Sequence, residues 1–210
     1  MARLVWTNDG SAPPDPSADR PRSADTAAAP SLGWHAMRAG EKAPRFRLRD
    51  QHGRSVTLSE LLLRGAVVLR FCRTENTATC IREFNSLSAL HIEAERLGAT
   101  LAVIAVEPFD PRPLGKDAVS FPFPILPDKD GDVARSYGLT YELSAQNGPD
   151  TSVAGSNPDR RREIMAAPAT YVLDQTGLVV LAFVDVECRS VMDHRQILMA
   201  LECLAGRNKP

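Results

Sequence analysis

Two patterns of hydrophobic and polar positions run through the chain, and together they predict an α/β fold. Residues 66–72 and 100–106 are almost continuously apolar and rich in β-branched residues, which is typical of strands buried on both faces. Between them, from Ile81 to Leu97, apolar residues recur three and four positions apart, the spacing of a helix with one buried face. Strand, helix and strand in this order predict a parallel crossover unit within a central sheet.

Shorter elements are predicted on both sides of this unit. In chain order they are a hairpin at 46–50 and 55–58, a helix at 59–63, a strand at 121–126, a helix at 133–137, a hairpin at 166–174 and 178–184, and a helix at 193–205. The prolines at 122 and 124 suit a sheet edge. The polar stretch 144–163, rich in Gly, Asn and Pro, predicts a surface insertion. One domain over residues 37–207 accounts for all of these elements.

Residues 1–36 are predicted to form a disordered N-terminal tail. From Asp9 to Ser31 no apolar residue is larger than proline, so this stretch cannot bury enough surface to offset the entropy of ordering. The apolar opening, Met1 to Trp6, is too short for the hydrophobic region of a secretory signal. We therefore expect a cytoplasmic protein.

Composition argues against two classes of partner. Charged residues make up 24% of the chain and the formal net charge is −1, which does not favour binding to nucleic acid or to an acidic membrane surface. No stretch reaches the roughly 18 consecutive apolar residues of a membrane-spanning helix. The sequence therefore predicts neither nucleic acid nor membrane as a partner.

The four cysteines show neither a C-x-x-C pair nor the spacing of zinc ligands, so we expect no metal site, no cofactor and no disulfide framework. Cys72 ends a predicted central strand and Cys203 lies in the closing helix, and both are predicted to pack in the core. Cys188 lies in a predicted loop. Cys80 differs from all three because it falls in the first turn of a helix.

A thiol at a helix start faces unpaired backbone N–H groups and the positive end of the helix dipole. Both stabilise a thiolate over a thiol, and a nearby arginine adds to the effect. Chemistry also tends to collect just beyond the carboxyl end of a central strand, where Cys80 is predicted to lie. The alternative is an inert buried cysteine that packs like alanine.

The order of elements, with a cysteine at a helix start and a proline-entered strand near the end, resembles a thioredoxin-like fold. We expect a central mixed β-sheet flanked by helices, with an N-terminal β-hairpin. Around Cys80 the chain resembles peroxiredoxins, because residues 77–83 supply their T-x-x-C-x-x-E motif. Residues 40–46 match the G-x-x-A-P-x-F opening of that family, and the resemblance runs from about Ala39 to Ala205.

This resemblance implies a thiol peroxidase that reduces hydrogen peroxide or organic hydroperoxides. Cys80 would be the peroxidatic cysteine, Thr77 would hydrogen-bond its sulfur or the peroxide, and Glu83 would orient an arginine. Arg73 stands where most peroxiredoxins have the proline of the motif. Pro168 replaces their late-strand arginine near the active site, so Arg73 or Arg82 would have to substitute.

Among the other cysteines, Cys188 would be the likeliest resolving thiol. The favoured mechanism nevertheless uses one cysteine and an external thiol reductant, either a thioredoxin-like protein or a low-molecular-weight thiol. A homodimer is left open. Thr77 stands where relatives with a W-C-P-x-C segment have their first cysteine, which leaves two other functions open. The chain could be a catalytically degenerate module for binding or redox sensing. A thiol–disulfide oxidoreductase is less favoured, since C-x-x-C is absent.

Overall fold

The structure is a computed structural model that describes residues 4–7, 35–73, 77–106, 121–142, 164–185 and 192–207. At residues 4–7, 73, 77–81, 141–142 and 164–165 the description covers the backbone alone.

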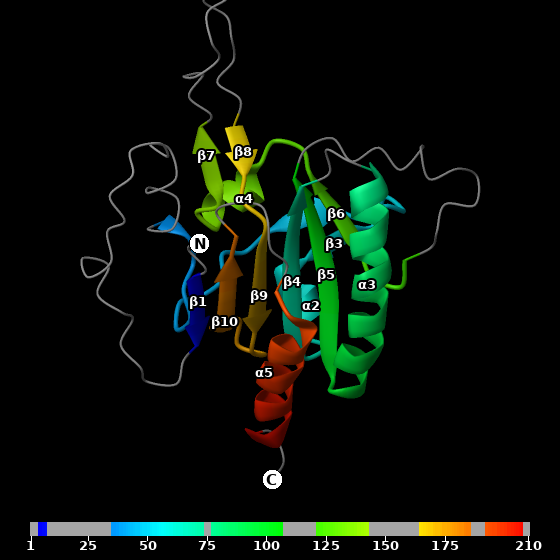
Figure 1. The fold of residues 1–210 in the computed structure, drawn as a ribbon, viewed down its shortest axis with the longest axis vertical. Helices are drawn as coiled ribbons and strands as arrows, with labels where there is room; N and C mark the ends of the chain where they lie inside the picture. The colour runs from blue at the N-terminus through cyan, green and yellow to red at the C-terminus, as the bar shows by residue number, and fades with distance from the viewer. Residues whose placement is uncertain are drawn as a thin grey trace, which may run out of the picture.

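A six-stranded mixed sheet forms the centre of the molecule (Figure 1). From edge to edge its strands are β1 (Leu4–Thr7), β10 (Val179–Val184), β9 (Ala169–Leu173), β4 (Ala66–Arg73), β5 (Ala99–Val106) and β6 (Ile125–Asp128). β4, β5 and β6 are mutually parallel, whereas β9 pairs antiparallel with both β4 and β10. Helix α3 (Thr77–Arg96) links β4 to β5. The predicted crossover unit and mixed sheet are confirmed.

Alternation along β4 sends its side chains to two different faces. Val67, Leu69 and Phe71 join one buried cluster, whereas Val68 and Cys72 join the other. Figure 1 shows α3 and α5 (His194–Arg207) lying against the second of these faces. The other face, which holds Val67, Leu69 and Phe71, is covered by α2 (Leu58–Leu62), by α4 (Asp132–Ser136) and by part of the chain that precedes α2. We call these the α2/α4 face and the α3/α5 face.

The N-terminal hairpin, β2 (Arg47–Arg49) and β3 (Ser55–Thr57), forms as predicted. Its turn is held by Asp50, whose Oδ1 accepts hydrogen bonds from the backbone N–H groups of His52 and Arg54 at 2.9 and 2.8 Å. An Asp that accepts from residues two and four positions on fixes a tight turn. His52 is therefore a turn residue, as its place beside Gly53 indicates.

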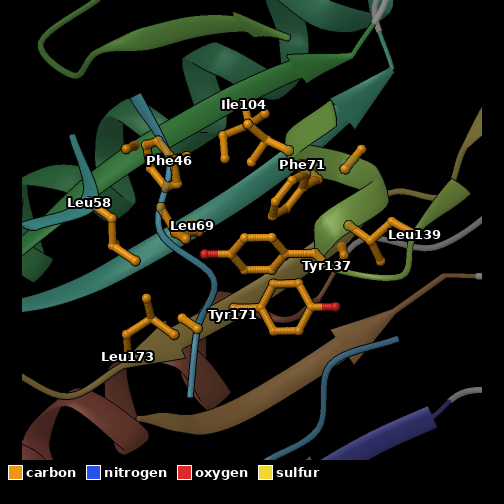
Figure 2. Packing of buried hydrophobic residues seen from close by; sticks show 14 of the residues in the cluster. Phe46, Leu58, Leu69, Phe71, Ile104, Tyr137, Leu139, Tyr171 and Leu173 are labelled. Atoms are coloured by element: carbon orange, nitrogen blue, oxygen red, sulfur yellow. The ribbon is translucent and has the colours of Figure 1, made fainter. Parts of the chain in front are cut away.

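Three aromatic rings fill the centre of the α2/α4 face (Figure 2). Phe71 lies 5.0 Å from Tyr137 and 5.9 Å from Tyr171, measured between ring centroids, and the two tyrosine rings are 5.5 Å apart. The three residues come from β4, from the C-terminal end of α4 and from β9. These three rings pack the sheet against the elements that cover it, close to the C-terminal end of β4.

Four predictions of the elements need correction. The tail is not disordered throughout, because β1 pairs with β10 and so satisfies the hydrogen-bonding groups of an otherwise open sheet edge. The strand expected at 121–126 begins only at Ile125, although β6 is an edge strand as its prolines suggested. The strand expected at 166–174 is split at Pro168. The fourth concerns Cys203, which is exposed rather than packed.

The position of Cys203 follows from helix geometry. Leu201 is buried against the sheet, and two residues further along a helix a side chain is turned by about 200°. Cys203 therefore points away from the core. Cys72, in contrast, is buried as predicted, with 1% of its surface exposed.

A second pairing, after that of β1 with β10, has no counterpart in the predicted elements. β7 (Thr140–Glu142) and β8 (Ile164–Ala166) form a separate two-stranded antiparallel sheet. They flank the stretch 144–163, whose predicted character as a surface insertion lies outside the described residues.

Candidate active site

The junction of β4 and α3 places the predicted nucleophile where the sequence expects it. α3 begins at Thr77, so Cys80 lies in its first turn, just beyond the carboxyl end of a central strand. The side chains of Arg73, Thr77 and Cys80, and all of Cys188, lie outside the described residues. Their predicted roles stay predictions.

A buried ion pair lies one helical turn beyond Cys80. The Nε of Arg70 donates a hydrogen bond to Oε1 of Glu83 at 2.7 Å. The Arg70 side chain is 4% exposed and that of Glu83 is 17% exposed. Charge-assisted hydrogen bonds of this kind are among the stronger ones in proteins, and here the pair is largely shielded from water.

Two further groups complete the surroundings of this ion pair. Arg70 Nη1 donates to Oγ1 of Thr170 at 3.1 Å, and the Sγ of Cys72 donates to the same Glu83 Oε1 at 3.2 Å. Strand register explains the first contact, because Thr170 on β9 is the direct antiparallel partner of Arg70. The result is a compact polar cluster of Arg70, Cys72, Glu83 and Thr170 inside an otherwise apolar layer.

The electrostatics of this polar cluster keep the guanidinium charged. Burial by itself lowers the pKa of Arg70, but the charges and hydrogen bonds of Cys72 and Glu83 outweigh that effect and the pKa is raised. A permanent positive charge is therefore held beneath the first turns of α3. Such a charge favours anionic groups nearby.

A small pocket of about 10 Å³ adjoins Arg70 between the sheet, α3 and α5. It is lined by Val68, Arg70, Leu87, Leu90, Thr170, Met192, His194 and Ile197. This space is sufficient for about one water molecule. Burial lowers the pKa of His194, with a further contribution from the nearby charge of Arg70, while Asp193 opposes the shift.

The sequence predicts that Glu83 orients an arginine, and in the structure Glu83 pairs with Arg70, an arginine that the prediction did not name. From the sequence alone Arg70 has no predicted role, and Arg73 and Arg82 are the arginines that would substitute for the late-strand one. The side chain of Arg82 is exposed. A signal was present, since a charge in the middle of a strand that is buried on both faces requires a buried partner of opposite sign.

Pro168 lies at the same end of the sheet. Its neighbour Ala169 pairs with Phe71, so Pro168 stands one residue further toward the end of β4. It is half-buried, and its carbonyl accepts a hydrogen bond from the backbone N–H of Asp185 at 2.9 Å. The described backbone thus places Pro168 near the β4–α3 junction, and its role at the active site stays a prediction.

Within the parts of the chain that the structure describes, no group of three or more His, Cys, Asp or Glu side chains is arranged to hold a metal ion. Among the helices of those same parts, none is long and apolar enough to span a membrane.

A mixed sheet with α3 and α5 on one face and a cysteine at the start of α3 defines a thioredoxin-like protein. The chain belongs to the AhpC/TSA family, which it matches over residues 39–182. It is 29% identical over 140 residues to the chloroplastic peroxiredoxin Q of Oryza sativa subsp. japonica, an alignment covering 67% of this chain and 56% of that protein. It thus spans little more than half the length of that relative.

Solved structures confirm the predicted fold. Peroxidoxin BcpB from Mycobacterium tuberculosis aligns with a TM-score of 0.60 and 26% identity, covering 80% of this chain and 98% of that one. Peroxiredoxin Q from Xanthomonas campestris aligns with a TM-score of 0.58 and 21% identity, covering 80% and 99%. The chain is therefore a peroxiredoxin-like protein of the thioredoxin fold.

Proposed function

We propose that this protein is a thiol-dependent peroxidase that reduces hydrogen peroxide or organic hydroperoxides through Cys80. One observation carries the proposal: Cys80 lies in the first turn of α3, one turn before the buried Arg70–Glu83 pair. Membership of the AhpC/TSA family and the peroxiredoxin Q relatives support the same chemistry.

In the proposed reaction the Cys80 thiolate attacks one oxygen of the peroxide. A sulfur–oxygen bond forms as the oxygen–oxygen bond breaks, and the second oxygen leaves with a proton as water or alcohol. Cys80 becomes a sulfenic acid. A thiol reductant then returns it to the thiol with release of water, and the reductant is oxidised to a disulfide.

The backbone and the polar cluster supply the electrostatics of this step. Backbone N–H groups at the start of α3 stabilise the Cys80 thiolate. The guanidinium of Arg70 adds a positive charge beneath the same end of the helix, and Glu83 holds that guanidinium in place. In our proposal Thr77 hydrogen-bonds the sulfur or the peroxide, and Arg73 or Arg82 takes the place of the late-strand arginine.

The remaining parts of the proposal concern the partners and setting of the protein. We propose an external reductant, either a thioredoxin-like protein or a low-molecular-weight thiol, and catalysis without a cofactor. We further propose a catalytic domain over residues 37–207 that acts in the cytoplasm. Gel filtration of reduced and oxidised protein tests whether a homodimer forms.

The decisive experiment measures peroxide consumption by the purified full chain in the presence of a dithiol. We expect Cys80→Ser to reduce the rate to that of the dithiol alone. Cys203→Ser is the matched control, because it removes an exposed thiol from the far end of α5 and leaves the β4–α3 junction intact. Wild-type protein that consumes peroxide no faster than Cys80→Ser would refute the proposal and favour a non-catalytic binding module.

A further inference from the structure

Cys72 does not have the surroundings of a cysteine that merely packs. It is 1% exposed within the apolar layer of the α3/α5 face, yet its Sγ donates a hydrogen bond to Glu83 Oε1 at 3.2 Å. The same oxygen accepts from Arg70 Nε at 2.7 Å. The thiol therefore has a carboxylate to take its proton and a guanidinium to stabilise its anion, which are the two aids that thiol nucleophiles use.

The contact with Glu83 also places Cys72 relative to Cys80. Residues three apart on a helix have Cβ atoms about 5–6 Å apart, so Glu83 and Cys80 are neighbours on one face of α3. Helical side chains lean toward the N-terminus, so the Glu83 side chain extends toward the turn that contains Cys80. Cys72 meets that side chain at its carboxylate, and it therefore lies beside the first turn of α3.

We infer that Cys72 is the resolving thiol of the proposed peroxidase. The inference rests on the proposed function, because it needs a sulfenic acid on Cys80. The Cys72 proton passes to Glu83, and the Cys72 sulfur attacks the Cys80 sulfur. A sulfur–sulfur bond forms, the sulfur–oxygen bond breaks, and the hydroxyl leaves with a proton as water.

The inference changes what the external reductant must do. It reduces a Cys72–Cys80 disulfide rather than a sulfenic acid, and two reductant thiols become one disulfide as both protein thiols are restored. The sequence alone favoured Cys188 as a resolving candidate. Cys203 is exposed on α5, whereas Cys72 contacts a residue one turn from the proposed nucleophile.

The test maps the oxidised cysteines of the full chain. Reduced protein is treated with one equivalent of hydrogen peroxide, free thiols are blocked with N-ethylmaleimide, and non-reduced peptides are identified by mass spectrometry. We expect a cross-link between the peptides of Cys72 and Cys80. Cys203→Ser and Cys188→Ser should leave this cross-link in place.

A second readout traps the sulfenic acid with dimedone. In Cys72→Ala the Cys80 adduct should increase at least about tenfold over wild type, because an intramolecular thiol outcompetes a reagent in solution. The cross-link in wild-type protein needs no variant, so a poorly folded Cys72→Ala does not remove the test.

The outcomes separate the two proposals. If Cys80 is oxidised but forms no bond to Cys72, and its sulfenic acid accumulates equally in wild type and Cys72→Ala, the resolving role is refuted while the peroxidase stands. A cross-link from Cys80 to Cys188 refutes it in the same way. If Cys80 is not oxidised in any variant, the proposed function itself is wrong.

Discussion

The two faces of the sheet come from the same strands, yet they differ in kind. On the α2/α4 face β4 contributes Val67, Leu69 and Phe71, and the layer is closed by the rings of Tyr137 and Tyr171 (Figure 2). On the α3/α5 face, the intervening positions of β4 contribute an arginine and a cysteine, and α3 contributes a carboxylate. One face therefore holds only apolar packing with two phenolic groups, whereas the other buries charge.

This difference separates stability from chemistry. An apolar layer gains free energy from each buried methylene and loses little when the pH changes. A buried ion pair gives weak net stabilisation but holds charges in a fixed place, provided that neither partner is removed alone. On the α3/α5 face, this buried ion pair lies directly beneath the start of α3, where Cys80 is located. We therefore expect substitutions on the two faces to affect different properties.

The largest effect is expected from breaking the ion pair. Glu83→Ala leaves the Arg70 guanidinium buried without its carboxylate, and the free energy of unfolding should fall by about 3–5 kcal/mol. Urea denaturation of the purified variant measures this loss.

The matched control is the double variant Arg70→Met with Glu83→Leu. Replacing a buried pair by apolar side chains of similar volume is often neutral or stabilising, so most of the lost stability should return. Oxidation of Cys80 by peroxide should nevertheless stay slower than in wild type, because the positive charge is gone. A double variant that reacts at the wild-type rate would show that the ion pair serves packing alone.

A core truncation on the other face should have the opposite profile. Leu69 is fully buried on the α2/α4 face, so Leu69→Ala should lower the free energy of unfolding by about 3 kcal/mol through lost burial and a residual cavity. Below the unfolding transition the rate of Cys80 oxidation should match wild type. A large change in that rate would mean that the two faces are coupled through β4.

The same contrast shows how far the sequence could predict the structure. Continuous apolar runs predicted β4 and β5 because few other arrangements bury such segments, and the helix-start cysteine followed from the spacing of α3. β1 was missed because four residues carry little pattern, and their pairing depends on an open edge of β10. β7 and β8 pair across the whole insertion, a contact that local pattern does not reveal.

At the candidate site, the contacts that the sequence did not predict are tertiary contacts between residues distant along the chain. Glu83 was predicted to orient an arginine, but its partner lies 13 residues earlier on a strand whose other residues are nearly all apolar. Thr170 lies 100 residues from Arg70, and only the register of β9 against β4 brings them together. Cys72 is buried, as predicted. The sequence did not predict that its place on the face opposite Phe71 would bring it into contact with the carboxylate of Glu83.

The two tyrosines of the α2/α4 face offer a smaller and more discriminating test. The Tyr137 hydroxyl donates to the carbonyl of Pro44 at 3.2 Å, so Tyr137→Phe should cost about 1 kcal/mol of unfolding free energy. The buried Tyr171 hydroxyl makes no well-formed hydrogen bond among the described residues, and its one weak contact is with the backbone of Met37, so Tyr171→Phe should be neutral or stabilising by up to about 1 kcal/mol. Equal losses in both variants would show that Tyr171 also makes a stabilising hydrogen bond.

The smallest effect should come from His194, which lines the pocket beside Arg70. Burial first, and Arg70 next, lower its pKa below the usual value of 6.5, while Asp193 opposes them. Above pH about 6.5 the imidazole is neutral in both folded and unfolded chains and contributes nothing to the pH dependence. As the pH falls below that value, the unfolded chain binds the proton first, so stability should decline until the lowered pKa is passed. Because His194 is only half-buried, the loss should stay below about 1 kcal/mol.

His194→Asn should remove this dependence of stability on pH, measured by urea titrations near pH 7.5 and pH 5, whereas Leu69→Ala should retain it. An unchanged slope in His194→Asn would place the acid sensitivity of the α3/α5 face elsewhere than beside its buried arginine.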